Sequence, residues 1–249
     1  MNEVKKKPLF FRFLRGIVKL VYKKYKVETK EDLREPGNIY VSNHAQIHGP
    51  LGQYLYFPQK RFVWVIGQMC NRKEVSQYAM EDFWSHKSKW TKWLYRLFSI
   101  IIVAPLGSYL FGRADTIPVY KDARLRKTMT QTIKCLDQGN DVIIFPECRT
   151  PKSKYIYQFQ EHFIDVARPY NRKTNKDLYF YPMYTCHDLG RILIGTPIKY
   201  NPDNNIENER IRINNYLQEE IAKLGESLPN HTIVPYVNMN KKYYKKSKE

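Results

Sequence analysis

The sequence predicts an α/β fold. We expect a single domain with a mixed, mostly parallel sheet flanked by helices, and a basic amphipathic helix at the N-terminus. Short apolar runs of strand length alternate with longer segments of helical periodicity. The 249 residues are enough for one domain with a sizeable core. Hydrophobic residues make up 43% of the chain, too many for a disordered protein.

Short apolar runs predict the strands of this sheet, over residues 37–42, 62–67, 115–120, 141–146, 178–184 and 192–195. Between them, residues 122–138 and 204–224 repeat apolar side chains at helical spacing. Asp122 and Gly139 flank the first of these helices, and each is a residue type that favours its end of a helix.

Residues 9–26 predict an amphipathic helix. Apolar side chains that include Phe10, Phe13 and Ile17 fall on one face, and only Arg and Lys fall on the opposite face. Such a helix can lie in the interface of an anionic bilayer. The alternative is a helix that covers the core and exposes its basic face to water.

The apolar stretch 97–112 is too short, at about 24 Å as a helix, to cross a bilayer core of about 30 Å. Pro105 and Gly107 also interrupt it. We expect either a buried core helix or an element that dips into one leaflet. Trp90 and Trp93 precede it and suit an interface.

The formal net charge of +18 indicates an anionic partner, which could be a membrane, a phosphorylated substrate or a nucleic acid. Nucleic-acid binding has no recognition motif to support it, so we expect none. The four cysteines stand alone, without a Cys-x-x-Cys pair, which favours a reduced cytosolic setting.

Two polar motifs each follow a predicted strand. Asn43 and His44 come after the first strand, and Glu147 ends a Phe-Pro-Glu run after 141–144. Ligand sites in open α/β sheets form where the strands give way to loops. A histidine there can act as a general base near neutral pH. Taken alone, His44 would be better interpreted as a structural residue that caps a loop.

The order of the motifs resembles that of the glycerolipid acyltransferase family, of the lysophosphatidic acid acyltransferase type. That family shows Asn-His-x-x-x-x-Asp, Ile-x-Val-x-Arg, Phe-Pro-Glu-Gly-Thr-Arg and apolar-Pro-apolar blocks. The similar blocks here lie in residues 43–49, 117–121, 145–150 and 181–183, followed by the Gly-Thr-Pro-Ile run 195–198. The resemblance covers roughly residues 35–225.

This resemblance implies that a fatty acyl group passes from a thioester donor, acyl-CoA or acyl carrier protein, to a hydroxyl of a lysophospholipid or glycerol-phosphate-type acceptor. It implies catalytic roles for His44 as general base and for Glu147. Asn43, His48, Lys121 and Arg149 would bind substrate, the two cations through phosphate. No resident cofactor and no metal are expected. The partners would be the lipid acceptor, the acyl donor and an anionic membrane surface.

The chain departs from the family pattern at Gly49, where the family has the aspartate that orients the histidine. Loss of such a carboxylate can lower a rate by orders of magnitude. His48, Asp115 or Glu147 could orient His44 instead. His44 and His48 are spaced as in helical zinc sites, but no third ligand is near.

We therefore predict three regions: a membrane-associating helix in residues 1–30, an acyltransferase-like domain in 31–235 and a basic tail in 236–249, which we expect to be frayed over 241–249. The predicted enzyme is peripheral or monotopic on the cytoplasmic face of the membrane. The alternatives are a catalytically impaired relative that binds lipids or membranes, and an acyltransferase with a non-phospholipid acceptor.

Overall fold

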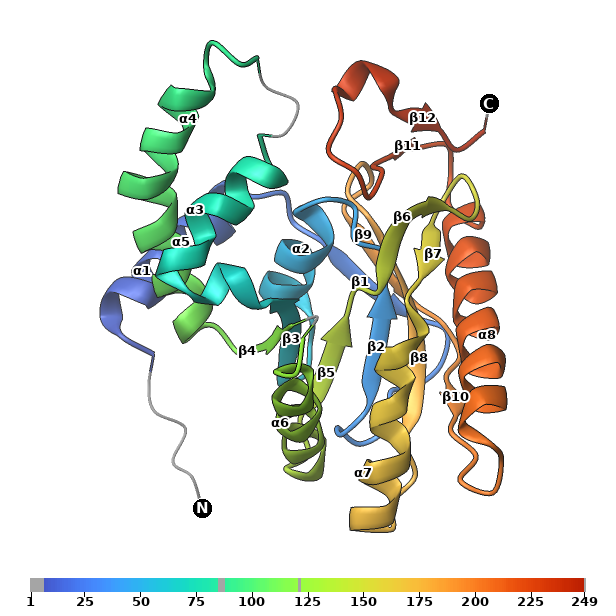
Figure 1. Ribbon diagram of the computed structural model, residues 1–249. Coiled ribbons are helices and arrows are strands. Elements are labelled where there is room, and N and C mark those ends of the chain that lie inside the picture. The colour runs from blue at the N-terminus through green and yellow to red at the C-terminus, as the bar shows by residue number, and fades with distance from the viewer. Residues whose placement is uncertain (1–6, 85–87, 121, 249) are drawn as a thin grey trace.

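The computed structural model describes residues 7–84, 88–120 and 122–248. Within them, the chain folds around one eight-stranded sheet of order β1-β9-β8-β2-β5-β3-β4, with β10 paired to β8 (Figure 1). Its strands are β1 Lys26–Thr29, β2 Ile39–Ser42, β3 Arg61–Ile66, β4 Thr116–Val119, β5 Asp141–Ile144, β8 Tyr179–Cys186, β9 Arg191–Ile194 and β10 Ile198–Lys199.

Most strand pairs in this sheet are parallel. β8, β2, β5, β3 and β4 follow one another in parallel, as do β1 and β9. Within the described part of this sheet, only the pairs of β8 with β9 and with β10 are antiparallel. The predicted α/β fold with a mixed, mostly parallel sheet is confirmed. Each of the predicted strands is present, with its ends within two residues of the expected positions.

The two central strands are buried on both faces, which is why their sequences are apolar without interruption. Ile39 and Val41 of β2 face one side, where they share a core with Val142 of β5. Tyr40 and Ile143 face the other side and belong to a second core. The sheet is therefore the middle layer of the domain.

Three helices cover the first face of the sheet. They are α6 Leu125–Asp137, α7 Ala167–Thr174 and α8 Ile206–Glu226. α8 buries Ile213, Leu217, Ile221 and Leu224, a stripe at helical spacing that packs on the sheet. The two helices predicted over 122–138 and 204–224 correspond to α6 and α8.

The remaining helices gather on the other side of the molecule (Figure 1). They are α1 Leu9–Val21, α2 His48–Tyr56, α3 Arg72–Glu81, α4 Lys92–Phe98 and α5 Ala104–Arg113, with a 3₁₀ turn η1 at Gly67–Cys70. Met69, Val75 and Ala104 form a small core of their own between η1, α3 and α5. α2 packs on the second face of the sheet, where Gln53 bonds to Ser42 and Thr185, and the other four helices form a cap beside the sheet.

The apolar stretch predicted over 97–112 lies within a longer helix. α4 and α5 are joined by one π-helical turn, η2 Ser99–Val103, into a helix of 22 residues, Lys92–Arg113. The π turn comes directly before Pro105, where the helix has no N–H to donate. Only 11% of the most apolar window of this helix is buried. The buried-core alternative is therefore wrong, and Ile101, for example, is 58% exposed.

The predicted N-terminal helix is shorter than expected. α1 ends at Val21, and Tyr25 is buried in the second core rather than on the apolar face of the helix. Residues 26–29, of which Lys26 was assigned to this helix, form β1, because they pair in parallel with β9. Pairing with a distant strand overrides the helical periodicity here.

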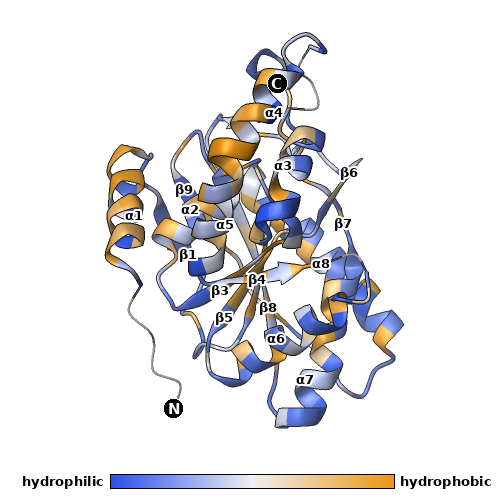
Figure 2. Ribbon diagram, turned by 60° about the vertical axis from the view of Figure 1, so that its left-hand side comes forward, coloured by the Kyte–Doolittle hydropathy of each residue, from blue (hydrophilic) through white to orange (hydrophobic). Residues whose placement is uncertain are grey.

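α1 turns its apolar face outward (Figure 2). Phe13 is 63% exposed and Leu20 is 85% exposed. The basic side chains Arg15 and Lys19 instead lie over the rings of Tyr54 and Tyr56 of α2. The alternative of a core-covering helix with a solvated basic face is therefore wrong.

The C-terminal segment is ordered, not frayed. β11 Thr232–Ile233 pairs with β12 Lys245–Lys246, and a 3₁₀ turn, η4 Lys241–Tyr243, lies between them. A second small sheet joins β6 Glu147–Pro151 to β7 Tyr157–Phe159, followed by η3 Glu161–Val166. Both small sheets lie beyond one edge of the main sheet, above the ends of β2 and β5 (Figure 1).

Candidate functional site

The two polar motifs meet at one edge of the sheet. β2 and β5 are parallel neighbours, so the residues that follow them emerge side by side. The backbone N–H of His44 donates to Glu147 Oε2 at 2.5 Å, across 103 residues of chain. The N–H of Tyr157 in β7 donates to the other carboxylate oxygen at 2.8 Å. Glu147 thus fixes the backbone of His44, not its ring.

Burial controls the protonation of Glu147. The side chain is almost fully buried, which raises the pKa of its carboxyl to about 7, and the N–H groups of His44 and Tyr157 oppose this shift. The carboxyl is therefore poised to change charge near neutral pH. A buried carboxyl with such a pKa is a common feature of functional sites.

The loop after His44 has an unusual backbone. Ala45 has φ of 43° and Gln46 has φ of 54°, so two consecutive residues with side chains are left-handed. The chain then turns back on itself, with the N–H of Gly49 donating to His44 O at 3.0 Å. This turn leads directly into α2.

The imidazole of His44 lies between aromatic rings. Phe145 and Tyr236 approach it edge-to-face, with ring centroids at 5.3 and 5.5 Å. Its Nδ1 atom is buried and has no hydrogen-bond partner in the described residues. Burial lowers the pKa of His44, so the ring is neutral at pH 7. A neutral imidazole is the form that accepts a proton.

The three residues expected to orient this ring have other partners. Glu147 binds backbone N–H groups, and Asp115 pairs with Lys7 at 2.8 Å. His48 Nδ1 lies 2.7 Å from the hydroxyl of Tyr22. None of the three therefore replaces the family's aspartate at His44 Nδ1.

Gly49 occupies a position that has no room for a side chain. A Cβ atom there would lie 2.4 Å from His44 O and 2.8 Å from Asn43 O. Both are backbone atoms and cannot move without reshaping the loop. The aspartate of the family pattern is thus incompatible with the loop as it folds here.

Asn43 joins two strands of the sheet. Its Oδ1 accepts from Thr185 N at 2.7 Å, and its Nδ2 donates to Thr185 O at 3.2 Å. Thr185 also bonds through its hydroxyl to Gln53 of α2 at 2.9 Å. These contacts hold the start of the His44 loop against β8, and they occupy both polar ends of the Asn43 amide.

His48 belongs to an aromatic cluster beside the loop. Its ring stacks on that of His187 with centroids 3.5 Å apart, and His187 Nδ1 lies 2.6 Å from the hydroxyl of Tyr25. Burial, the neighbouring His187 and Lys241 lower the pKa of His48 to about 4. His48 is therefore neutral at pH 7, and only its Nε2 remains for a substrate.

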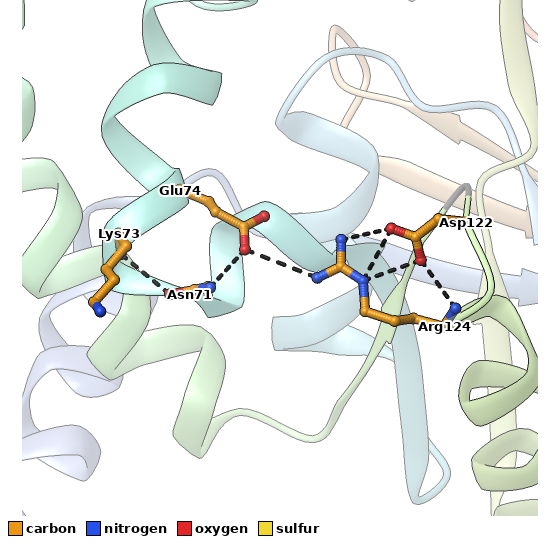
Figure 3. A network of polar contacts seen from close by, with 5 residues as sticks. All are labelled: Asn71, Lys73, Glu74, Asp122 and Arg124. Carbon is orange, nitrogen blue, oxygen red and sulfur yellow. Dashed lines mark hydrogen bonds and ion pairs between the residues drawn. The ribbon is translucent and has the colours of Figure 1, made fainter.

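The predicted cation Arg149 lies at the surface, apart from the buried core of the site. Arg149 is 78% exposed on β6 and lies 3.8 Å from a carboxylate oxygen of Asp82. Lys121 lies outside the described residues. Its neighbour Arg124 binds Asp122 at 2.7 Å and reaches Glu74 at 3.8 Å (Figure 3). This network connects α3 of the helical cap to the loop between β4 and α6.

Two cavities, of about 550 and 400 Å³, open at the opposite edge of the sheet, near the starts of β8 and β2. Tyr200 and Arg212 line the first, and Gly37 and Tyr179 line the second. Neither includes His44 or Glu147. In the described ranges, no group of three His, Cys, Asp or Glu side chains could hold a metal ion.

Sequence reasoning missed Tyr236, Tyr157 and Gln46 as parts of this site. Tyr236 lies far from both motifs in sequence, whereas Tyr157 follows Glu147 by 10 residues, and their rings are 5.7 Å apart beside the His44 loop. No motif marks Tyr236, because its place beside His44 depends on how the C-terminal segment folds back onto the loop.

Comparison with known proteins gives one family. The family model described as Acyltransferase matches residues 24–185, which include His44 and Glu147. No curated protein matches the chain. Among solved structures, the chain is similar to the 1-acyl-sn-glycerophosphate (LPA) acyltransferase PlsC from Thermotoga maritima, at 12% sequence identity and a TM-score of 0.44, covering 86% of this chain and 81% of that one.

Proposed function

The chain belongs to the Acyltransferase family and is an acyltransferase, and from this premise we propose that it works on lipids at a membrane surface. In this proposal a fatty acyl group passes from a thioester donor, acyl-CoA or acyl carrier protein, to a hydroxyl of a lysophospholipid or glycerol-phosphate-type acceptor. No resident cofactor takes part.

The observation that carries this proposal is the place of His44. The ring is neutral and follows a buried strand at the edge of the sheet, with its backbone bonded to Glu147. In the proposed reaction, His44 takes the proton of the acceptor hydroxyl while the hydroxyl oxygen attacks the thioester carbonyl carbon. The bond from carbon to sulfur then breaks, and the thiol leaves with a proton.

The acceptor's phosphate needs cations close to this histidine. Arg149 is exposed, and within the described residues its ion pair with Asp82 is a long one at 3.8 Å. We assign Arg149 and Lys121 to phosphate binding, because a guanidinium or ammonium binds phosphate oxygens strongly. His48 is uncharged at pH 7, so its proposed contact with substrate is a hydrogen bond rather than an ion pair.

The apolar surface of the helical cap supports membrane association. α1 lies next to the helix Lys92–Arg113, with Phe10 and Tyr109 in edge contact at 5.7 Å. The exposed apolar side chains on the two helices include Leu9, Phe10, Phe13, Leu20, Trp93, Leu97, Ile100 and Ile101. Apolar side chains exposed in this number on two neighbouring helices are typical of a protein or membrane contact. We propose that it enters the interface of an anionic bilayer on the cytoplasmic face.

Replacement of the histidine tests the proposal. We expect His44→Ala in the full chain to lower acyl transfer from a long-chain acyl-CoA to lysophosphatidate at least about 100-fold, the usual share of a general base. Release of free thiol measures the rate. The control is His162→Ala, because His162 is exposed on η3 and should leave the rate unchanged. Full activity of His44→Ala would refute the proposed role.

A second candidate is a catalytically impaired relative that binds lipids or membranes. Two observations favour it: the orphan Nδ1 of His44 and the absence of room for a carboxylate at Gly49. The same assay separates the two. Turnover of any acyl thioester that depends on His44 excludes the impaired relative, and vesicle binding without such turnover supports it.

A further inference from the structure

The loop that carries His44 needs an outside support. Ala45 and Gln46 both lie in the left-handed region, which is unfavourable for a residue that has a Cβ. Such a conformation persists only where the surrounding structure holds it. Neither residue is a glycine, so the chain itself does not favour this turn.

The C-terminal segment, residues 231–248, supplies a support through Gln46. The side-chain Nε2 of Gln46 donates to Val237 O at 3.2 Å. The hydroxyl of Tyr244 donates to Oε1 of the same side chain at 3.1 Å. Both ends of the Gln46 amide are therefore held by one segment, nearly 200 residues away in sequence.

The same segment also contacts the His44 ring through Tyr236. It is itself anchored to the domain, because Lys154 Nζ donates to Ser247 O at 2.6 Å and the hydroxyl of Tyr184 lies 3.2 Å from His231 Nε2. It also lies beyond the residues that the family model matches. The support of the loop is therefore outside the matched part of the chain.

We propose that the C-terminal segment positions His44 through the hydrogen bonds of Val237 and Tyr244 to the side chain of Gln46. These hydrogen bonds take the place of the aspartate that Gly49 excludes. Gln46 and Tyr244 are then positioning residues, which fix the left-handed turn and so the direction of the imidazole. This inference rests on the proposed role of His44.

Removal of the Tyr244 hydroxyl tests the hydrogen bond to Gln46. We expect Tyr244→Phe to lower kcat about fivefold, the effect of one lost hydrogen bond between neutral groups, with KM little changed. The matched control is Tyr243→Phe, because the adjacent Tyr243 is exposed and its hydroxyl has no hydrogen bond within the described residues. Equal kcat values for the two variants would count against the proposal.

A pair of substitutions at Gln46 separates positioning from general stability. Both Gln46→Ala and Gln46→Gly remove the hydrogen bonds to Val237 and Tyr244. Alanine keeps the Cβ that disfavours a left-handed turn, whereas glycine has no Cβ and adopts the turn without strain. We expect kcat of the glycine variant to exceed that of the alanine variant about fivefold. A merely structural Gln46 predicts equal kcat values for the two variants when both are measured fully folded, because the turn would then not affect the catalytic step.

A spectroscopic measurement tests the inference without any activity. Long-range ¹H–¹⁵N spectra of histidine-labelled protein report the tautomer of each imidazole, and His44→Ala assigns the His44 signal. We expect this signal to move in Gln46→Ala and to stay in Tyr243→Phe. An unmoved signal overturns the positioning role. If His44→Ala remains fully active, the proposed function fails, but this result still decides whether the segment positions the ring.

Discussion

Glu147 holds a buried carboxyl between two backbone N–H groups, and this makes the stability of the protein depend on pH. Its pKa is about 7 in the folded chain, against 4.5 ordinarily. The folded state therefore binds the proton more tightly than the unfolded state. This contribution to stability is fully present below pH 4.5 and is lost as the pH rises to about 7.

We expect the free energy of unfolding to fall by up to about 3 kcal/mol from this one group between pH 4.5 and pH 7. Glu147→Gln should remove most of that slope. Its amide cannot accept from both N–H groups, and the lost hydrogen bond lowers the free energy of unfolding by an amount that does not change with pH. Urea unfolding at pH 5.0 and 7.5 measures the slope. Glu219→Gln, at an exposed glutamate, should keep the wild-type slope. A slope that survives in Glu147→Gln would assign the pH dependence to other groups.

Only those residues of the site that belong to a sequence motif could be predicted. His44 and Glu147 lie together at the edge of the sheet because their strands are parallel neighbours. The resemblance predicts an aspartate at the position of Gly49, but not that two backbone oxygens fill the space of its side chain. That fact depends on the left-handed turn at Ala45 and Gln46, for which neither residue type gives a signal.

At the scale of elements, strands were easier to predict than the helices of the cap. The strand β5 is buried on both faces, so its run of apolar residues stands out in the sequence. In contrast, α3 is polar and buries few side chains, and nothing in its periodicity marks it. β1 was assigned in part to a helix, because only its pairing with β9 makes it a strand.

The outward apolar faces of the cap helices lead to a prediction about membrane binding. Ile101 is 58% exposed in the middle of the helix Lys92–Arg113. A charged side chain at that position would have to leave water on insertion, which costs a few kcal/mol at depth. We expect Ile101→Glu to weaken binding to vesicles of phosphatidylglycerol and phosphatidylcholine about tenfold or more, as measured by sedimentation.

The chain offers a closely matched control for this experiment. Ile211 is 57% exposed on α8, which covers the opposite face of the sheet. Ile211→Glu changes the net charge by the same amount but lies away from the cap. Its binding to vesicles should equal that of the wild type to within the effect of one charge. Equal losses in both variants would show that charge, not the cap, determines binding.

For the whole molecule, a net charge of +18 and an apolar surface act together. Basic residues near an anionic surface contribute about 1 kcal/mol each, and salt screens this attraction over a Debye length of about 10 Å at 0.1 M. The apolar contribution is not screened. Binding to a membrane should therefore weaken with salt but persist, because the cap helices remain inserted.

Binding to nucleic acid should respond to salt differently. An attraction made of charge alone falls steeply with salt, since it depends on the release of counterions. We expect the full chain to sediment with anionic vesicles at about 0.1 M and at about 0.5 M salt, and to release duplex and single-stranded DNA between those concentrations. Equal persistence on DNA would instead indicate a nucleic-acid site. Complete release from vesicles at 0.5 M would show that the exposed helices do not enter the bilayer and that charge alone brings the enzyme to lipid.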